Sequence, residues 1–549
     1  MAVVSFGKKQ FEREIGSIDE KMMNNIALFG TPVNSVTEED IEIEVFPNRP
    51  DLLSYHGFKR AFLKFIGKEK RIADYKANPP EKNYRVNIES SVKDIRPYVA
   101  CAIVKEMNLN SEKIKEIIDI QEKIHLTLGR KRKKMAIGIY PLDKIKLPII
   151  FTALEPDKIR FIPLESEKEM SGLEILQKHQ AGKEYAHLLA GKEKFPIFID
   201  ADNNILSMPP IINSNITGKI TESTKDLFVE CSGFDFDSLK KSLNILAAAL
   251  SDMGGKIYQM EIKMPWKLRK ETTPDMASEK RKISLENANK FLGLSLTEKD
   301  MKILLEKMGH EYKKPSIVMT PAWRTDILHE VDLIEDIAIA YGYDKFAPEI
   351  PEIATIGKED KKEIIKRKIS EILCGLGIIE VSNYHLTTKK DQFEKTEDKE
   401  TRAIEIKNSK TEYTLLRKDL THYLMKNLSE NVDSEYPQRI FEIGKIFSEK
   451  KGIISEEENL AIAISPGNFT ELKQILEYLK KMIDMTISIK EAEEFPPWFI
   501  DGRVAEITLN NNKIGFIGEI HPKILKEWRI KMPVVLAEIS LEEIFNELK

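Results

Sequence analysis

The segment PAWRTDILHEVDLIEDIAIAYGYD, which runs from Pro321 to Asp344, gathers five carboxylates within eleven residues. They belong to Asp326, Glu330, Asp332, Glu335 and Asp336. No lysine or arginine lies between Arg324 and Lys345, although the chain holds 85 such residues. The segment therefore concentrates negative charge, and we expect that charge to be uncompensated within the segment.

The spacing of its apolar residues predicts how this segment folds. In a helix over 329–341, four apolar residues recur at intervals of three and four and form one stripe. They are Val331, Ile334, Ala338 and Tyr341. Asp332, Glu335 and Asp336 then share another face, with Asp326 just upstream. Asp332 and Asp336 form a like-charged pair four residues apart, which costs a few tenths of a kcal/mol unless something neutralises it.

Two interpretations of this acidic face stay open on spacing alone. Acidic helical faces are common, and charges near the start of a helix are stabilised by its dipole. A hard divalent ion is the other interpretation, because Mg²⁺ prefers oxygen ligands and is often held by only one or two direct carboxylates.

The composition is typical of a multidomain globular protein. The chain has 549 residues and a hydrophobic fraction of 42%, enough for roughly three or four packed domains. Its net charge is only −4, so no global field attracts nucleic acid and any RNA contact must be local. The basic run GRKRKK at 129–134 is of a kind that is most often solvated surface.

The three cysteines are Cys101, Cys231 and Cys374, and none forms a C-x-x-C pair. A disulfide framework or a structural zinc site is therefore not expected. Cys231 is expected to be a packed, unreactive thiol. No apolar run approaches the roughly 18 residues that a membrane span requires, so we expect a cytoplasmic protein.

Four segments follow from the pattern of elements. Residues 1–83 predict an N-terminal α/β domain, and residues 84–268 alternate short strands with helices. Residues 269–350 predict helix, turn, helix and strand, followed by the acidic helix. Residues 351–549 predict an antiparallel sheet backed by helices.

Three local patterns make narrower predictions. IEIEVF at Ile41–Phe46 alternates as a half-buried strand does. Pro50 is suited to begin a helix, since its missing N–H costs no hydrogen bond there. The stretch 206–217, where two prolines precede Asn213 and Ser214, predicts an irregular loop able to line a pocket.

Six stretches, taken in order, resemble one family: the β subunit of phenylalanine–tRNA ligase in its archaeal and eukaryotic form. They are FPNRPDLLSYHGFKRA (46–61), GRKRKKMAIGIYPLDKIKLP (129–148), KEYAHLLAGKEKFPIFIDADNNILSMPPIINSNIT (183–217), PAWRTDILHEVDLIEDIAIAYGYDKF (321–346), PQRIFEIGKIF (437–447) and DGRVAEITLNNNKIGFIGEIHPKIL (501–525). Six motifs in register across the chain leave little room for coincidence.

The resemblance implies an α+β multidomain fold. Its parts are an N-terminal α/β domain, an editing-type α/β domain, a helix-turn-helix-like domain that carries the acidic helix, and a class II synthetase-like antiparallel sheet domain without active-site signatures.

The resemblance also implies partners and cofactors. Members of the family pair with a separate α subunit as an (αβ)₂ heterotetramer, which attaches phenylalanine to tRNA(Phe) with ATP and Mg²⁺. The acids that match Asp326, Asp332, Glu335 and Asp336 are assigned there to a Mg²⁺ site shared with the α subunit. This favours the cation interpretation, because a shared metal turns carboxylate repulsion into an assembly contact. Glu330 lies on the apolar side of the expected helix and is not a candidate.

No catalytic residue for aminoacylation is expected in the last segment. RIFEIGKIF resembles the class II strand that supplies an ATP-contacting arginine, which would be Arg439. The companion signature, a glycine-rich strand that ends in arginine, is missing because Gly502 and Arg503 stand alone. We therefore expect a structural role for this segment against the α subunit.

The second segment resembles the family's editing domain, which hydrolyses tyrosine wrongly attached to tRNA(Phe). Its candidate pocket residues are Asn213, Ser214, Glu230 and Ser232. The family's Asp-Val-Thr-Gly-Thr-Asp stands here as ECSGFD at 230–235, and its Gly-Ile/Leu-His-Asp as GIYP at 138–141. Phe234 in place of Thr removes a hydroxyl and adds a ring large enough to fill the site. We therefore predict weak or absent proofreading.

Two other functions remain as alternatives. A stand-alone tRNA-binding or editing deacylase module would need no partner subunit. A DNA reader would use the third segment, but its would-be recognition region at 295–315 mixes acids with bases and attracts phosphate poorly.

Overall fold

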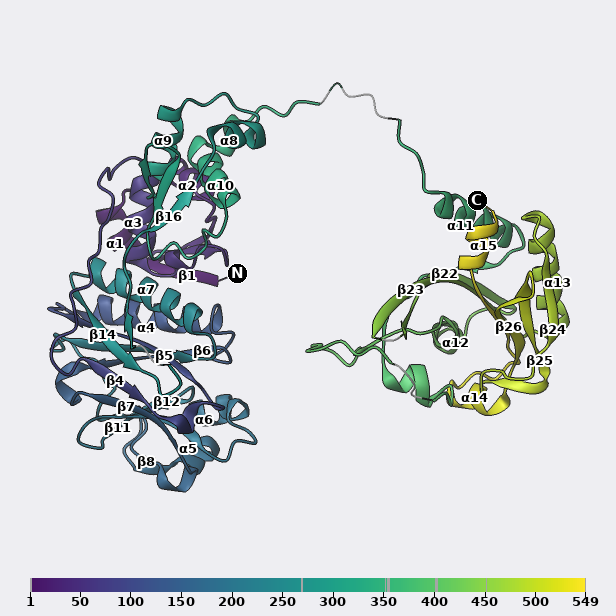
Figure 1. The fold of residues 1–549 in the computed structure, drawn as a ribbon, viewed down its shortest axis with the longest axis horizontal. Coiled ribbons are helices and arrows are strands. Elements are labelled where there is room, and N and C mark those ends of the chain that lie inside the picture. The colour runs from purple at the N-terminus through teal and green to yellow at the C-terminus, as the bar shows by residue number, and fades with distance from the viewer. Residues whose placement is uncertain are drawn as a thin grey trace. The chain divides into compact units, whose positions relative to one another are not determined.

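The computed structural model describes residues 2–267, 270–350, 352, 356–399, 403–450 and 452–548. The chain divides into two compact units, Met1–Glu349 and Ile350–Lys549, and each has its own hydrophobic core (Figure 1). The domain boundary expected at 268–269 lies outside the described residues, and so does residue 351, where the last segment was expected to begin.

The first unit begins with a three-stranded antiparallel sheet in the order β1-β3-β2, accompanied by three helices. Its elements are β1 (Ala2–Gly7), α1 (Lys8–Glu14), α2 (Glu20–Leu28), β2 (Val33–Val36), β3 (Asp40–Val45) and α3 (Tyr55–Phe65). Ile41, Ile43 and Val45 alternate into the core, which confirms the strand prediction for IEIEVF.

The helix expected to start at Pro50 is interrupted. Pro50–Leu52 forms one 3₁₀ turn, and α3 begins only at Tyr55. Ser54 separates them because its side chain accepts a hydrogen bond from the backbone N–H of Gly57 and so caps the new helix.

A ten-stranded sheet forms the middle of this unit. Its strand order is β12-β11-β10-β7-β4-β14-β5-β13-β6, with β15 paired to β14 beside this path. The strands are β4 (Arg85–Ile88), β5 (Tyr98–Lys105), β6 (Met135–Pro141), β7 (Ile149–Leu154), β10 (Phe195–Ile199), β11 (Ile205–Met208), β12 (Ile212–Asn213), β13 (Leu227–Gly233), β14 (Lys256–Lys263) and β15 (Glu271–Thr273).

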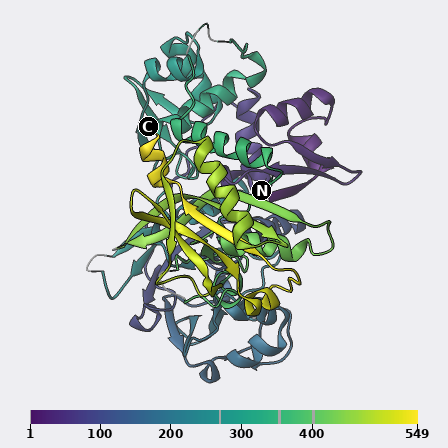
Figure 2. The same ribbon diagram turned by 90° about the vertical axis from the view of Figure 1, so that its right-hand side faces the viewer.

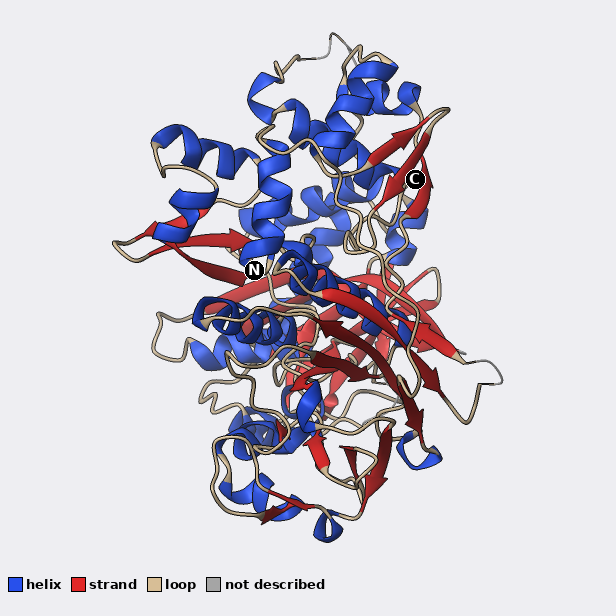
Figure 3. Cartoon of the chain, turned by 90° about the vertical axis from the view of Figure 1, so that its left-hand side faces the viewer, coloured by secondary structure: helices blue, strands red, loops and turns tan. Residues whose placement is uncertain are grey.

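Helices pack on both sides of this sheet (Figures 1 and 3). Helices α4 (Ser111–Leu126) and α7 (Phe236–Asp252) form one layer, between the sheet and the N-terminal elements. The other side carries α5 (Gly172–Lys178), α6 (Gln180–Tyr185) and the small pair β8 (Arg160–Phe161) and β9 (Met170–Ser171).

The loop expected at 206–217 is instead largely an edge hairpin of this sheet. Ser207 pairs with Asn213 and Met208 pairs with Ile212 in the antiparallel register, and Pro209 and Pro210 stand in the turn. The prolines end a strand here without preventing the pairing on either side of them.

The last part of the first unit confirms the expected order of helix, turn, helix and strand. Its elements are β16 (Glu279–Lys282), α8 (Leu285–Leu292), α9 (Glu298–Lys307), β17 (Glu311–Lys313), β18 (Ile317–Thr320) and α10 (Glu330–Tyr341). Gly293 ends α8 in the left-handed conformation, and a Thr297–Asp300 capping box begins α9. Helix α10 packs on α9 and α8.

The second unit is built on a seven-stranded sheet in the order β19-β22-β23-β27-β26-β25-β24, antiparallel except for the pair β19 and β22. Its strands are β19 (Ile379–Glu380), β22 (Gln438–Lys450), β23 (Ile453–Ser465), β24 (Ile487–Glu491), β25 (Phe499–Leu509), β26 (Asn512–Ile520) and β27 (Val535–Ser540). A two-stranded sheet of β20 (Leu386–Thr387) and β21 (Leu415–Leu416) lies apart from it in the pairing.

Helices cover both faces of this sheet. On one face lie α11 (Lys361–Gly375), α13 (Phe469–Met482) and α15 (Glu542–Glu547), and on the other lie α12 (Thr421–Glu430) and α14 (Pro522–Glu527). Alternate residues of β23 face the two layers, since Leu460 and Ile462 join the first and Ala461 and Ala463 the second. Figure 1 shows α12 and α13 separated by the strands, and Figure 2 views the second unit from the side that carries α13. Among the described residues, no helix combines the length and apolarity needed to cross a membrane.

Candidate functional site

Helix α10 begins with a cap that uses one of the four predicted metal ligands. The His329 ring accepts a hydrogen bond from the backbone N–H of Val331. The Asp332 carboxylate accepts hydrogen bonds from the backbone N–H groups of Leu328 and His329, both at 2.7 Å. Asp332 therefore satisfies free donors at the start of the helix, where negative charge is favoured.

Arg324 balances the charge of the acidic segment. Its buried guanidinium donates to both carboxylate oxygens of Asp326, at 3.0 and 2.8 Å, and to Oδ2 of Asp336 at 2.7 Å. His310 Nε2 lies 2.7 Å from the same Asp336 oxygen. Burial opposes ionisation of Asp336, but the Arg324 charge and the His310 hydrogen bond hold its pKa below its ordinary value. The expectation of uncompensated charge was wrong for two of the five acids, because the segment's own arginine folds back onto Asp326 and Asp336.

The buried face of α10 also differs from the expected stripe. Val331 is 42% exposed, whereas Asp336 is only 4% exposed. The buried apolar residues are Leu333, Ile334, Ile337, Ala338 and Ala340. The helix is rotated relative to the expected orientation, since Arg324 allows one carboxylate to lie inside.

Glu335 is the exposed member of the four predicted ligands. Its carboxylate forms no hydrogen bond or ion pair with any described residue, and partial burial together with the charges of Asp336 and Asp332 raises its pKa. Among the described residues, no group of three or more His, Cys, Asp or Glu side chains is arranged to hold a metal ion. The four acids do not fit one magnesium cage within this chain, because Asp326 and Asp336 are both bound by Arg324.

The second site lies where β13, β6 and the edge hairpin meet. Glu230 on β13 is 2% exposed and stands opposite Gly138 of β6. Burial raises the pKa of Glu230 to about 8, although the nearby Arg96 charge opposes the shift. Its Oε2 atom has no hydrogen-bond partner among the described residues. At neutral pH this carboxyl group is therefore largely protonated.

Tyr140 fills the centre of this site. Its hydroxyl lies 2.8 Å from Ser207 Oγ, 3.3 Å from Glu230 Oε1 and 3.4 Å from Asn213 Oδ1. A Cβ atom on Gly138 would come within 2.2 Å of the same hydroxyl, so only glycine leaves room for the ring. Two of the predicted residues, Asn213 and Glu230, are thus brought together, but around a tyrosine of the chain itself.

The two predicted serines are engaged elsewhere. Ser232 Oγ and its carbonyl oxygen accept hydrogen bonds from Arg96 at 3.1 and 2.7 Å. Ser214 is 2% exposed and accepts from the backbone N–H of Ile216. Phe234 does not fill the pocket, contrary to expectation: it is 51% exposed, because it follows the last residue of β13 and leaves the sheet.

Sequence reasoning missed the roles of Ser207 and Arg96, and no sequence signal marked either residue. The role of Tyr140 had one signal, its replacement of the family's histidine. The adjacent Cys231 is fully buried, and burial raises the pKa of its thiol, as expected for a packed residue.

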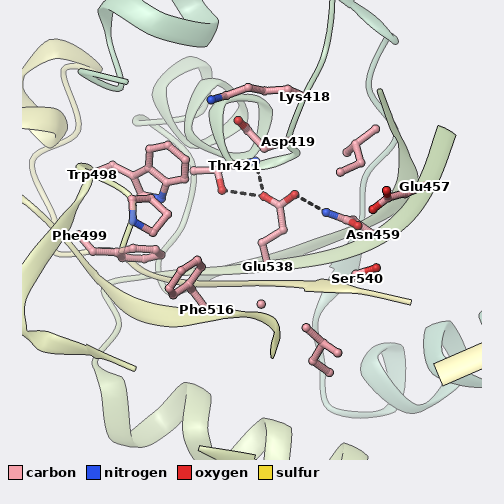
Figure 4. Close-up of a pocket in the computed structure, with 14 residues that line it drawn as sticks. Lys418, Asp419, Thr421, Glu457, Asn459, Trp498, Phe499, Phe516, Glu538 and Ser540 are labelled. Carbon is pink, nitrogen blue, oxygen red and sulfur yellow. Dashed lines mark hydrogen bonds between the residues drawn. The ribbon is translucent and has the colours of Figure 1, made fainter. Parts of the chain in front are cut away.

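A third candidate is a cavity of about 300 Å³ in the second unit, beside the face that carries α12 (Figure 4). Glu538 of β27 lies at its centre and accepts hydrogen bonds from the Leu420 and Thr421 backbone, the Thr421 hydroxyl and the Asn459 amide. These bonds cap α12, which has no side-chain cap of its own. Trp498, Phe499 and Phe516 form the apolar wall.

The charge of this cavity does not suit a nucleotide. Three acids line it, namely Asp419, Glu457 and Glu538, and the only cation that lines it among the described residues is Lys418. Lys418 is itself paired with Asp398. Burial, then the neighbouring Asp419 charge, raises the pKa of Glu538 to about 7. A triphosphate would meet repulsion here rather than stabilisation.

Arg439 lies away from this cavity. Its guanidinium pairs with Glu471 of α13 at 2.8 Å, and α13 covers the opposite face of the sheet. Arg439 is thus engaged on the face of the sheet that α13 covers.

Three family models match the chain in order. The B3/4 domain covers residues 91–249, the tRNA synthetase B5 domain residues 281–343, and the phenylalanyl tRNA synthetase beta chain CLM domain residues 347–541. The phenylalanine–tRNA ligase β subunit of Thermococcus sibiricus is 40% identical over 91% of this chain and 90% of its own length. That of Archaeoglobus fulgidus is 35% identical over 100% of this chain and 99% of its own length.

The chain belongs to the phenylalanine–tRNA ligase β-subunit family. A solved structure of this family agrees with its first unit. The N-terminal fragment of the Pyrococcus horikoshii phenylalanyl-tRNA synthetase β subunit matches with a TM-score of 0.59 and 36% identity, covering 62% of this chain and 99% of the fragment. The mixed α/β fold of the matched part of this chain is thus shared with a crystal structure.

Proposed function

We propose that this chain is the β half of a phenylalanine–tRNA ligase, which joins a separate α subunit in an (αβ)₂ heterotetramer and attaches phenylalanine to tRNA(Phe) with ATP and Mg²⁺. The similarity to named β subunits over the whole length carries this proposal. The acidic cavity of the second unit supports a structural rather than an ATP-binding role for this unit. With one paired lysine against three acids among its described lining residues, this cavity offers ATP no free cation, which supports an aminoacylation site on the α subunit.

For the Mg²⁺ site shared with the α subunit, we propose a narrower ligand set than Asp326, Asp332, Glu335 and Asp336. Asp332 and Glu335 are three residues apart on α10, and both keep carboxylate oxygens without a described partner. Mg²⁺ needs only one or two protein carboxylates when waters and a partner supply the rest. Asp326 and Asp336 would act through Arg324, by fixing the helix that presents the other two. When bound, the ion would neutralise the charges that raise the pKa of Glu335.

The third part of the proposal concerns proofreading. An editing-type site needs a pocket for the tyrosine side chain and polar partners for its hydroxyl. In this chain Tyr140 takes that space and already uses Ser207, Asn213 and Glu230. We expect hydrolysis of Tyr-tRNA(Phe) to be slow or absent.

Co-expression with the α subunit of the same source tests the proposal. The complex should form phenylalanyl-tRNA, and the isolated chain should make no phenylalanyl-adenylate in an ATP–pyrophosphate exchange assay. Adenylate formation by the isolated chain would contradict the proposal. A chain that stays monomeric beside the α subunit and deacylates mischarged tRNA would instead support the alternative of a stand-alone deacylase module.

A further inference from the structure

The cavity around Glu538 in the second unit is built on paired strands. Asn459 of β23 stands opposite Ser540 of β27, and Ala461 stands opposite Glu538. Because strand residues alternate between the two faces of a sheet, Glu457, Asn459, Glu538 and Ser540 all point to the face that carries α12. Two of the three acids in the cavity are thus held by regular strand pairing.

One buried polar atom in this cavity lacks a partner. Asn459 is 7% exposed, and its amide nitrogen donates to Oε1 of Glu538 at 2.8 Å. The Oδ1 atom of the same amide forms no hydrogen bond with any described residue. Figure 4 shows the Asn459 side chain directed toward Glu538 in the cavity. A buried acceptor without a partner costs free energy, so this position favours a ligand that brings a hydrogen-bond donor.

The side chains around this acceptor carry negative charge. Asp419 is held by the Gln392 amide at 2.7 Å and by His422, whose Nδ1 atom lies 3.0 Å away. Glu538 is held by the backbone donors at the start of α12. Lys418, the one lining cation within the described part of the chain, is already in an ion pair. Both acids are thus fixed before a ligand arrives, and a cation is stabilised by their charge.

An aromatic wall completes the cavity. Trp498 and Phe499 are buried, and their ring centroids lie 6.0 Å apart. Phe516 is half-buried, and Nζ of Lys513 lies 4.0 Å from its ring centroid, so this ring already attracts one cation. Aromatic faces attract cations and also bury the apolar body of a ligand. The half-buried Phe516 and Glu538 leave the cavity accessible from solvent.

Two other classes of ligand fit this cavity poorly. A metal ion needs free carboxylate oxygens, but both oxygens of Glu538 already accept hydrogen bonds. Among the described residues, no three His, Cys, Asp or Glu side chains are arranged to hold a metal ion. A ligand that carries a carboxylate would be repelled by Asp419 and Glu538. An organic cation without a carboxylate therefore suits the cavity best.

We propose that this cavity binds a small organic amine, whose ammonium group donates to Oδ1 of Asn459 and whose apolar body packs on the aromatic wall. An ammonium group has three donors and is favoured beside the charges of Asp419 and Glu538. The volume of about 300 Å³ lies at the lower end of the range for small-molecule sites, which suits an arylalkylamine. The inference goes beyond the proposed function, which assigns no ligand to this cavity.

Isothermal titration calorimetry of the full-length chain tests this site. At pH 8 Glu538, whose pKa is about 7, is largely ionised, and an alkylamine is still protonated. The probes are 2-phenylethylamine, the neutral 2-phenylethanol and the anionic 3-phenylpropionate. The amine should bind roughly 10-fold or more tightly than the alcohol, and the propionate should bind more weakly than both. Equal affinity for the amine and the alcohol would overturn the proposal, and this comparison needs no variant.

Three variants locate the ligand within the chain. Glu538→Gln removes a charge and Asn459→Leu removes the free acceptor, so each should weaken amine binding roughly fivefold or more. Phe516→Leu, at a half-buried position that tolerates the change, should weaken it about threefold. Glu456→Gln is the matched control, because Glu456 is an exposed acid of the same strand that pairs with Lys445. Urea unfolding establishes which variants are folded.

The control variant should bind the amine like the wild type. An equal loss of affinity in Glu456→Gln, or unchanged affinity in every folded variant of the cavity, would overturn the proposal.

The same titration on the αβ complex distinguishes a free amine from a lysine side chain of a partner. Excess phenylalanine occupies the aminoacylation site during this measurement. Amine binding that persists in the complex, and that Glu538→Gln weakens, supports the small-molecule site. Loss of amine binding on assembly would show that the partner fills the cavity and would overturn the proposal. Failure to form the complex would refute the proposed function, whereas the titration of the isolated chain would still decide the amine site.

Discussion

A single guanidinium sets the charge balance of the acidic segment. Arg324 binds Asp326 and Asp336 at 2.7–3.0 Å and is almost fully buried. Asp336 can lie inside the protein because Arg324 and His310 are its partners, since an unpaired buried carboxylate would lose far more hydration than packing returns. In the sheet domain, Tyr140 has a comparable influence. One ring fills the centre of the site formed by Ser207, Asn213 and Glu230.

Tyr140 provides a direct prediction for proofreading. Tyr140→Ala should open the site and make the αβ complex hydrolyse Tyr-tRNA(Phe) faster than the wild type, at a stability cost of about 3–5 kcal/mol for the cavity. Tyr140→Phe keeps the ring, so hydrolysis should stay slow, with a cost of about 1–3 kcal/mol for the unpaired polar groups. Deacylation of preformed Tyr-tRNA and urea unfolding measure the two effects. Equal deacylation rates in all three proteins would show that the ring does not limit the site.

Glu230 provides a prediction about pH. Its pKa rises from 4.5 to about 8 in the folded chain, so the native state holds a proton that the unfolded state releases between these values. The contribution of Glu230 to stability therefore falls as the pH rises from about 4.5 to 8. Glu230→Gln removes this dependence, and its stability relative to the wild type should increase by up to about 3–4 kcal/mol from pH 5 to pH 8.

Urea unfolding at several pH values measures this effect. A constant difference between Glu230→Gln and the wild type across the range would mean that Glu230 does not titrate as described. Asp235→Asn is a suitable comparison, because Asp235 is an exposed cap whose pKa is lowered by the Ser238 hydrogen bonds. The stability difference between Asp235→Asn and the wild type should change at lower pH instead.

At the scale of elements, α10 has buried and exposed acids on different faces. Asp336 points inward to Arg324 and His310, while Glu335, the adjacent residue, is exposed. Asp332 stands at the first turn and serves the cap with one carboxylate oxygen. One helix thereby uses three acids in three different ways, although all three have the same side-chain chemistry.

The two faces of α10 should separate in mutational tests. Asp336→Asn breaks a buried ion pair and should lower the free energy of unfolding by about 3 kcal/mol or more. Glu335→Gln should change it by less than about 0.5 kcal/mol but weaken assembly with the α subunit in Mg²⁺. Asp332→Asn should likewise loosen the αβ complex more than it destabilises the chain. Sizing of the αβ complex with and without EDTA measures assembly, and urea unfolding of the chain measures stability. Unchanged affinity of Glu335→Gln and Asp332→Asn for the α subunit would count against the shared ion.

At the scale of the whole molecule, the chain contains separate hydrophobic cores. One core joins the N-terminal sheet, most of the ten-stranded sheet and α10, and a second lies among α5, β8, β10 and β11. Two more cores lie on the faces of the seven-stranded sheet. The solved N-terminal fragment from Pyrococcus horikoshii covers 62% of this chain. Both units therefore possess the buried apolar surface that an independent fold requires.

Residues 1–349, expressed alone, should fold and keep the ion pairs of Arg324. We expect a cooperative thermal transition and a near-ultraviolet dichroism signal from the buried aromatic residues of this part. Arg324→Met in the same fragment should lower the transition temperature, because it leaves Asp326 without an ion-pair partner and Asp336 with His310 alone. A fragment without a cooperative transition would show that the first unit depends on residues 350–549.

Much of this protein follows from local sequence. Periodicity predicted the strand at Ile41–Phe46, the helix over 329–341 and the antiparallel sheet of the last segment. The spacing of apolar residues along the sequence differs between strands and helices, so it can be read without knowledge of distant contacts. The six family motifs determined the family for the same reason, since they are linear. Only the tertiary structure decided three other features. They are which of the four acids Arg324 binds, the exposure of Phe234 and the position of Tyr140. Each depends on contacts between residues far apart in sequence, such as His310 with Asp336 or Tyr140 with Ser207 and Glu230, and no local pattern encodes such distances.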